Sequence, residues 1–198
     1  MSNVRFLPWV GQAYRVGFAG KRVLVLGESH YCASPQDAVP TITRDVIKGL
    51  SDPTLEHEPY MNTYTKFVET MVGRDRLTHR EKGDFWESVA FYNFVQSPLP
   101  KARLAPSVEE FRSGETAFFE VLEELRPETV VAWGSRLYNN LPKGGMQGDD
   151  IKGPDGRWME TWKYFLRDGS PVHVIPIMHP SSSSFSPSYW HEIISTII

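Results

Sequence analysis

Val23-Leu-Val-Leu-Gly-Glu-Ser-His-Tyr31 decides the fold of this chain, because a short apolar run passes directly into glycine and polar residues. A buried parallel strand reads as such a continuous apolar run, and its polar end delivers side chains to the edge of the sheet. Three further segments have the same form: Phe91-Tyr-Asn-Phe-Val-Gln96, Val130-Val-Ala-Trp-Gly-Ser135 and Val174-Ile-Pro-Ile-Met-His-Pro-Ser-Ser182. The carboxyl ends of parallel strands meet at one edge, so we expect a shared pocket that can hydrogen-bond a planar, polar ligand.

Length and composition indicate one folded domain. The chain has 198 residues, of which 40% are hydrophobic and 13% aromatic. This length suits one core and is short for two, so we expect a single domain over residues 1–198. The apolar runs are too short to span a membrane, and the first residues lack the pattern of a secretory signal, so we expect no membrane partner and a cytoplasmic location. The single cysteine, Cys32, cannot form an internal disulfide or hold a metal cluster.

The segments between the strands predict helices that cover the sheet. Residues 64–71 carry apolar side chains on one face, and a helix is expected after Ser107, where Glu110 completes a capping-box pattern. Ser186-Pro187 predicts a terminal helix through Ile197, and Ser135 is expected to cap a short helix. The expected fold class is α/β, a three-layer α/β/α sandwich with a short, mainly parallel four-stranded central sheet.

Three other segments complete the expected layout. Residues 86–95 are rich in aromatic and β-branched side chains and predict the second strand, and residues 158–166 are expected to pair with the fourth. Residues 32–62 are rich in proline, aspartate, threonine and serine. They predict a loop-rich insertion that covers the site, with a short helix near residues 43–50.

The formal net charge of −3 gives no overall preference for nucleic acid, so a DNA-binding protein would need local basic groups. The candidates are Lys21 with Arg22, residues 74–82, Lys101 with Arg103, and Arg136 with Lys143 and Lys152. Each group taken alone also fits scattered surface charge.

The ordered set of strand ends resembles the uracil-DNA glycosylase superfamily. In that superfamily a first strand ends in a glycine-led motif, a second in an asparagine that reads the base, a third in Trp-Gly or a relative, and a fourth in His-Pro-Ser. The corresponding residues here are Gly27 to Tyr31, Asn93, Trp133-Gly134 and His179-Pro180-Ser181. The resemblance covers the chain from about Lys21 to the end, and the insertion after Tyr31 has no counterpart. It implies a DNA glycosylase that acts on uracil or another modified base flipped out of single- or double-stranded DNA.

The chemistry of this reaction explains the residue types. Cleavage of an N-glycosidic bond develops negative charge on the leaving base, so a fixed hydrogen-bond donor lowers the barrier, and His179 suits that role. Asn93 offers one acceptor and two donors, which match the edge of a pyrimidine. Each residue also has a structural interpretation, since His179 can cap the strand and Asn93 can bond the turn at residues 96–98.

The resemblance assigns the remaining site residues. Tyr31, Gly27 and His30 are expected to join Asn93 in base binding, with Tyr31 limiting bulk at the pyrimidine C5 position. Ser181, Ser182 and Ser183 are expected to hold a DNA phosphate through hydroxyl and backbone donors, unless they form only a mobile loop. Phe185 is a candidate wedge for the vacated base stack, and Trp133 with Gly134 complete the expected DNA-binding set.

The first motif departs from the family pattern. Relatives that excise uracil efficiently commonly place Asp or Asn two residues after the glycine, where this chain has Ser29. Glu28 is the carboxylate of the motif, so Glu28 and Ser29 are the candidates for positioning water or sugar. No metal and no cofactor is expected.

Two other functions stay open. A binding module with the same fold could keep the pocket without catalysis, as Ser29 and the acidic net charge allow. In a serine hydrolase, Ser29 would be the nucleophile and His179 its base, although Tyr31 stands where the nucleophile elbow needs its second glycine.

Overall fold

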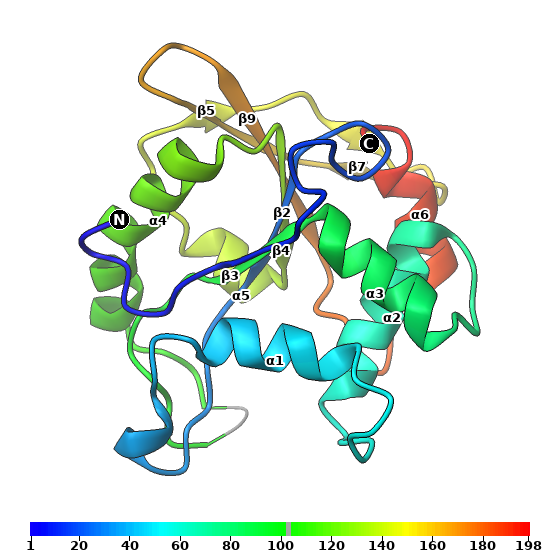
Figure 1. Cartoon of the computed structure of the whole chain (residues 1–198). Coiled ribbons are helices and arrows are strands. Elements are labelled where there is room, and N and C mark those ends of the chain that lie inside the picture. Colours follow the sequence, from blue (N-terminus) through cyan, green and yellow to red (C-terminus); the bar gives the residue numbers. More distant parts are fainter. Residues whose placement is uncertain (102–103) are drawn as a thin grey trace.

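Strand β2 (Val23–Gly27) lies inside a seven-stranded sheet in the computed structural model, which describes residues 1–101 and 104–198 (Figure 1). It pairs in parallel with β3 (Ala90–Asn93) and with β4 (Thr129–Trp133), and β4 pairs in parallel with β9 (Pro171–Ile177). The four apolar segments therefore form four adjacent parallel strands, as predicted.

The sheet is wider than the predicted four strands. Antiparallel strands extend it at both edges, namely β1 (Trp9–Val10) beside β3, and β8 (Trp162–Phe165) with β5 (Met146–Gln147) beyond β9. Three of its pairings are parallel and three antiparallel, so "mainly parallel" describes the centre alone. The predicted pairing of residues 158–166 with the fourth strand is confirmed for β8. A separate hairpin joins β6 (Ile151–Lys152) and β7 (Trp158–Met159).

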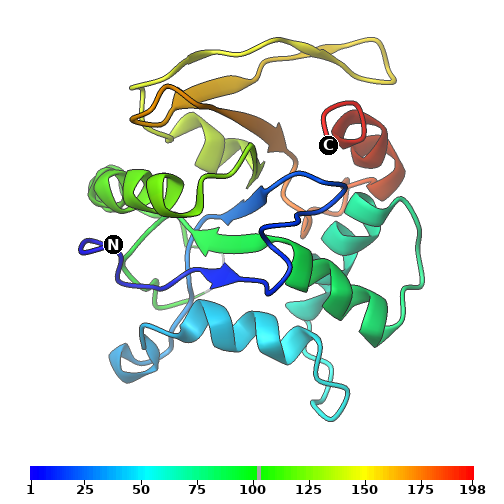
Figure 2. The same cartoon turned by 45° about the horizontal axis from the view of Figure 1, so that its top comes forward.

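Helices cover both faces of the sheet and give three layers (Figure 2). On one face lie α4 (Val108–Leu125) and α5 (Ser135–Asn139). On the other lie α1 (Ile42–Leu50), α2 (Met61–Val72), α3 (His79–Ser88) and α6 (Pro187–Ile194). None of the helices in the described residues is both long and apolar enough to cross a bilayer.

Alternation along β2 explains why this strand is apolar throughout. Leu24 and Leu26 pack on the α4 side, whereas Val23 and Val25 pack on the side of α2 and α3. Successive side chains of a strand point to opposite faces, and both faces are buried here. Every residue of β2 is therefore buried, and the chain becomes polar only where the strand ends.

Helix ends follow local sequence signals in most places. The Ser107 side chain accepts from the backbone N–H of Glu110, and Glu110 bonds back to Ser107, which confirms the predicted capping box. Gly134 rather than Ser135 is the N-cap of α5. Helix α6 starts after Ser186 as predicted but ends at Ile194, short of Ile197.

Two segments differ from the prediction. The second strand begins at Ala90, because a capping box between Thr78 and Glu81 starts helix α3, which runs to Ser88 and contains Trp86. In the insertion at residues 32–62, the short helix predicted near residues 43–50 is confirmed as α1, and the 3₁₀ turn η1 (Pro35–Asp37) is the element that was not predicted. Ile47 of α1 is buried in the core, so this helix is part of the sheet-covering layer.

Candidate functional site

The carboxyl ends of the four parallel strands bring the predicted segments to one edge of the sheet. Gly27 lies opposite Asn93 in the parallel register, and Trp133 lies opposite Ile177, two residues before His179. The expected convergence of these motifs is therefore present.

Gly27 is required by a close approach between β2 and β3. A Cβ atom at this position would lie 2.2 Å from Oδ1 of Asn93 and 3.0 Å from Cζ of Phe91. Ordinary contact begins at 3.4 Å, so only glycine leaves room for the Asn93 side chain. Gly27 shapes the site through its missing side chain.

Asn93 belongs to a buried chain of polar side chains. Its amide nitrogen lies 3.0 and 3.3 Å from the two ring nitrogens of His30, and His30 Nε2 lies 2.8 Å from the hydroxyl of Thr43. The amide nitrogen only donates, so the ring accepts from it, and the neutral ring can donate its own N–H to Thr43. Burial lowers the pKa of His30 to about 4, which keeps the ring neutral. His30 was predicted to bind the base; it is 6% exposed and Asn93 4%, and what distinguishes His30 is its contact with the Asn93 amide, through which it can orient that side chain.

Glu28 forms an ion pair that sequence reasoning missed. Arg136 donates through Nε to one carboxylate oxygen at 2.8 Å and through Nη2 to the other at 2.5 Å. The Glu28 side chain is 9% exposed and that of Arg136 48%, so a buried carboxylate is held by a half-exposed guanidinium. The positive φ of Gly134, +95°, turns the chain from β4 into α5, which carries Arg136. One signal in the sequence could have pointed to this ion pair, because Arg136 comes three residues after the end of the third predicted strand.

His179 is held in one neutral tautomer. The backbone N–H of Ser181 donates to His179 Nδ1 at 3.1 Å, and the Ser181 hydroxyl lies 2.7 Å from the same atom. Because Nδ1 accepts, the hydrogen of the neutral ring is on Nε2. Burial and the charge of Arg136 lower the pKa of His179, whereas Glu28 acts in the opposite direction. The ring packs edge-on against Trp133 with centroids 5.9 Å apart.

Aromatic side chains lie beside His179, and Tyr64 of α2 is a second residue that sequence reasoning missed. The rings of Tyr64, Phe91 and Trp133 contact one another with centroids 5.3 to 5.6 Å apart. Trp133 was predicted to bind DNA, but it is 3% exposed and belongs to the core. Tyr31 is 46% exposed, so it is available to a ligand. Burial raises the pKa of Tyr64, and its phenol is neutral.

The serine residues and Phe185 occupy different environments. The hydroxyl of Ser29 is buried without a hydrogen-bond partner in the described residues. It forms no hydrogen bond with His179, so the nucleophile–base pair of a serine hydrolase is not assembled.

Ser181 to Ser183 lie in the turn after His179, and Ser181 forms a hydrogen bond with that ring. Phe185 is 6% exposed and stacks on Trp190, a placement that does not suit a wedge.

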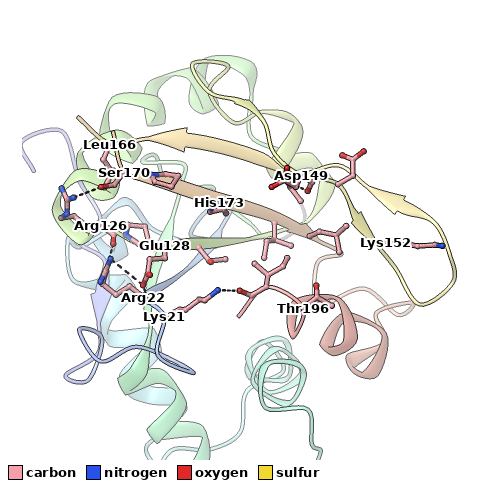
Figure 3. A pocket seen from close by; sticks show the side chains of 18 residues that line it. Lys21, Arg22, Arg126, Glu128, Asp149, Lys152, Leu166, Ser170, His173 and Thr196 are labelled. Carbon is pink, nitrogen blue, oxygen red and sulfur yellow. Dashed lines mark hydrogen bonds and ion pairs between the residues drawn. The ribbon is translucent and has the colours of Figure 1, made fainter. Parts of the chain in front are cut away.

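A pocket of about 900 Å³ lies at the opposite edge, next to the amino ends of β2, β4 and β9 (Figure 3). Its lining includes Lys21, Arg22, Glu128 and His173 and none of the predicted site residues. Arg22 pairs with Glu128 at 3.7 Å, and Lys21 donates to the carbonyl of Ile197, so both cations have partners within the protein. The basic pair predicted at Lys21 and Arg22 therefore lies away from the candidate site. Arg103 of another basic group lies outside the described residues.

No protein-family model matches this chain, and no curated protein has a significantly similar sequence. The functional argument therefore depends on the residues at the carboxyl edge of the sheet.

Proposed function

We propose that this chain is a DNA glycosylase similar to the uracil-DNA glycosylase superfamily, which hydrolyses the N-glycosidic bond of uracil or another modified base flipped out of DNA. The observation that supports this most is the state of His179. Its Nδ1 accepts from Ser181, so its Nε2 carries the hydrogen, and Nε2 has no partner in the described residues. A neutral imidazole held in this way is a fixed donor for a leaving base.

The proposed reaction breaks the bond between C1′ of the sugar and the base nitrogen. The bonding electron pair leaves with the base, whose carbonyl oxygen becomes negative, while the sugar becomes positive. His179 Nε2–H donates a hydrogen bond to that oxygen, a water molecule adds to C1′, and the proton that this water loses passes to the departed base anion, which leaves as the neutral base. A single donor of this kind contributes about 10²-fold to 10³-fold in rate.

Asn93 and Glu28 have separate roles in this proposal. The hydrogen bond from the Asn93 side-chain amide to His30 uses only one of the two N–H groups. Asn93 therefore keeps its carbonyl oxygen and the other N–H for the edge of the base. The Glu28 carboxylate accepts hydrogen bonds from Arg136 on both oxygens, which holds it in one orientation. In this proposal its negative charge stabilises the positive sugar, and its remaining lone pairs orient water.

Alkali-revealed strand cleavage tests the proposal. Labelled single- and double-stranded oligonucleotides with uracil, hypoxanthine or modified cytosines are incubated with the wild-type protein and with His179→Ala and Asn93→Ala. We expect abasic sites from the wild type and a loss of about 10²-fold or more in each variant. His57→Ala is the matched control, because His57 is exposed and belongs to another part of the chain. Absence of abasic product on every substrate would contradict the proposal for those bases.

A nucleobase-binding module without catalysis is the second candidate. It is favoured by Ser29, which stands where active relatives commonly carry Asp or Asn, and by the burial of its hydroxyl. This alternative predicts DNA binding that Asn93→Ala weakens, with no strand cleavage in any variant.

A further inference from the structure

The ion pair of Glu28 and Arg136 is at the same edge of the sheet as His179, because Gly134, two residues before Arg136, lies so close to His179 that a Cβ on it would be 3.4 Å from His179 Cβ. Glu28 immediately follows β2, and Arg136 lies on α5, which follows β4. The two residues are 108 positions apart in the sequence and meet through two charge-assisted hydrogen bonds of 2.8 and 2.5 Å. A bidentate pair of this kind fixes the orientation of the carboxylate as well as its position.

Two opposite charges therefore act on the His179 ring. Glu28 favours the charged imidazolium and Arg136 disfavours it. Tyr31, next to Arg136, and Tyr64, next to Trp133, are the neighbouring titratable groups, and phenols carry no charge at neutral pH. Without Arg136, burial would still lower the pKa of His179, but no positive charge would oppose the effect of the Glu28 carboxylate.

We propose that Arg136 is a positioning residue, which fixes the Glu28 carboxylate at the edge of the sheet and balances its charge so that His179 stays neutral with its hydrogen on Nε2. Protonation of His179 at Nδ1 would place that hydrogen against the backbone N–H of Ser181, so the charged ring would lose this backbone hydrogen bond and keep only the Ser181 hydroxyl as a partner on Nδ1. Arg136 and Ser181 thus favour the same neutral tautomer by different means.

The catalytic consequence depends on the proposed function, but the charge balance does not. The charge balance is therefore tested first, by an NMR pH titration of the His179 ring, which needs no substrate. In Arg136→Gln we expect the pKa of His179 to rise by about 0.5 or more, because the opposing charge is gone. In Glu28→Gln we expect it to fall, and in the double variant to return close to the wild-type value.

Two controls separate charge from shape. Arg126→Gln removes an arginine that pairs with Asp168 at the end of α4, and it should leave the His179 titration unchanged. Arg136→Lys keeps the charge but loses the two-pronged contact, so the pKa of His179 should stay close to wild type. If cleavage is observed, Arg136→Lys should lower kcat by about tenfold through a misplaced carboxylate.

The outcomes distinguish the two proposals. An unchanged His179 pKa in Arg136→Gln would overturn the role of Arg136, whether or not the protein cleaves DNA. The expected pattern of pKa values without any glycosylase activity would support the charge balance and reject the proposed reaction. Arg136→Gln leaves a lone buried carboxylate and can fail to fold. In that case Glu28→Gln and the double variant still test the proposal. Equal His179 pKa values in Glu28→Gln and wild type would overturn it.

Discussion

Gly27→Ala is expected to disrupt the candidate site and destabilise the fold at the same time. The new Cβ would lie 2.2 Å from Oδ1 of Asn93, where ordinary contact begins at 3.4 Å. The Asn93 side chain would have to move, and its bond to His30 would break. Overpacking costs about 1 to 3 kcal/mol, and a lost buried hydrogen bond adds about 1 kcal/mol.

The expected loss in the free energy of unfolding is therefore about 2 to 4 kcal/mol, which corresponds to a fall in Tm of about 5 to 15 °C for a domain of this size. Urea denaturation with an unchanged m value measures the first quantity. The amide resonances of Asn93 report whether its side chain has moved. If the proposed function holds, base excision falls together with this movement.

Gly49→Ala is the matched control. Gly49 lies inside helix α1, and a Cβ there would meet its nearest neighbour, Cδ1 of Leu55, at 3.4 Å. Alanine is the better helix former, so this variant should be neutral or more stable by up to about 1 kcal/mol. Gly27→Ala with wild-type stability and an unmoved Asn93 would refute the close-approach argument.

Three further predictions concern stability and are measured by urea denaturation. Thr43→Val removes the hydroxyl that meets His30 Nε2 and should cost about 1 to 3 kcal/mol, whereas Thr43→Ser should cost much less; equal losses would contradict the role of the hydroxyl. The pKa of His30 is about 4 when folded and 6.5 ordinarily, so the unfolded chain binds the proton first as the pH falls. Stability should decrease from about pH 6.5 to 4, by about 3 kcal/mol for this group, and His30→Gln should flatten that dependence. Ser107→Ala removes the side-chain half of the capping box and should cost about 1 kcal/mol, and an unchanged midpoint would count against the cap.

The central strands and several helix starts were predictable because their signals are local. A run such as Val23 to Leu26 can only be buried on both sides, and the capping box at Ser107 operates within four residues. The boundary at Trp86 was missed because aromatic residues suit both strands and buried helix faces. The edge strands β1 and β5 have two residues each, too few to show a period.

The sequence predicted that certain strand ends meet, and not which side chains contact one another there. His179 and Asn93 were predicted as site residues because each stands at the end of an apolar run, and the structure places these strand ends at one edge of the sheet. Arg136 was predicted only as part of a possible basic group, and Tyr64 only as part of a helix. The sequence does not show whether a helical side chain faces solvent, a buried carboxylate or a cluster of aromatic rings. Phe185 was predicted as a wedge because it is an apolar residue next to a run of serines. In the structure it is buried and stacks on Trp190.

The sequence by itself determined which segments become buried strands and where their polar ends fall, because burial on both faces demands continuous apolar runs. Only the tertiary structure decided which of those polar groups meet. The pairing of Glu28 with Arg136, 108 residues away, and of His30 with Asn93, 63 residues away, depends on the order of the strands and on the turn at Gly134. Hydrogen bonds require distances near 3 Å, and a position along the chain does not fix such a distance until the strands are packed side by side.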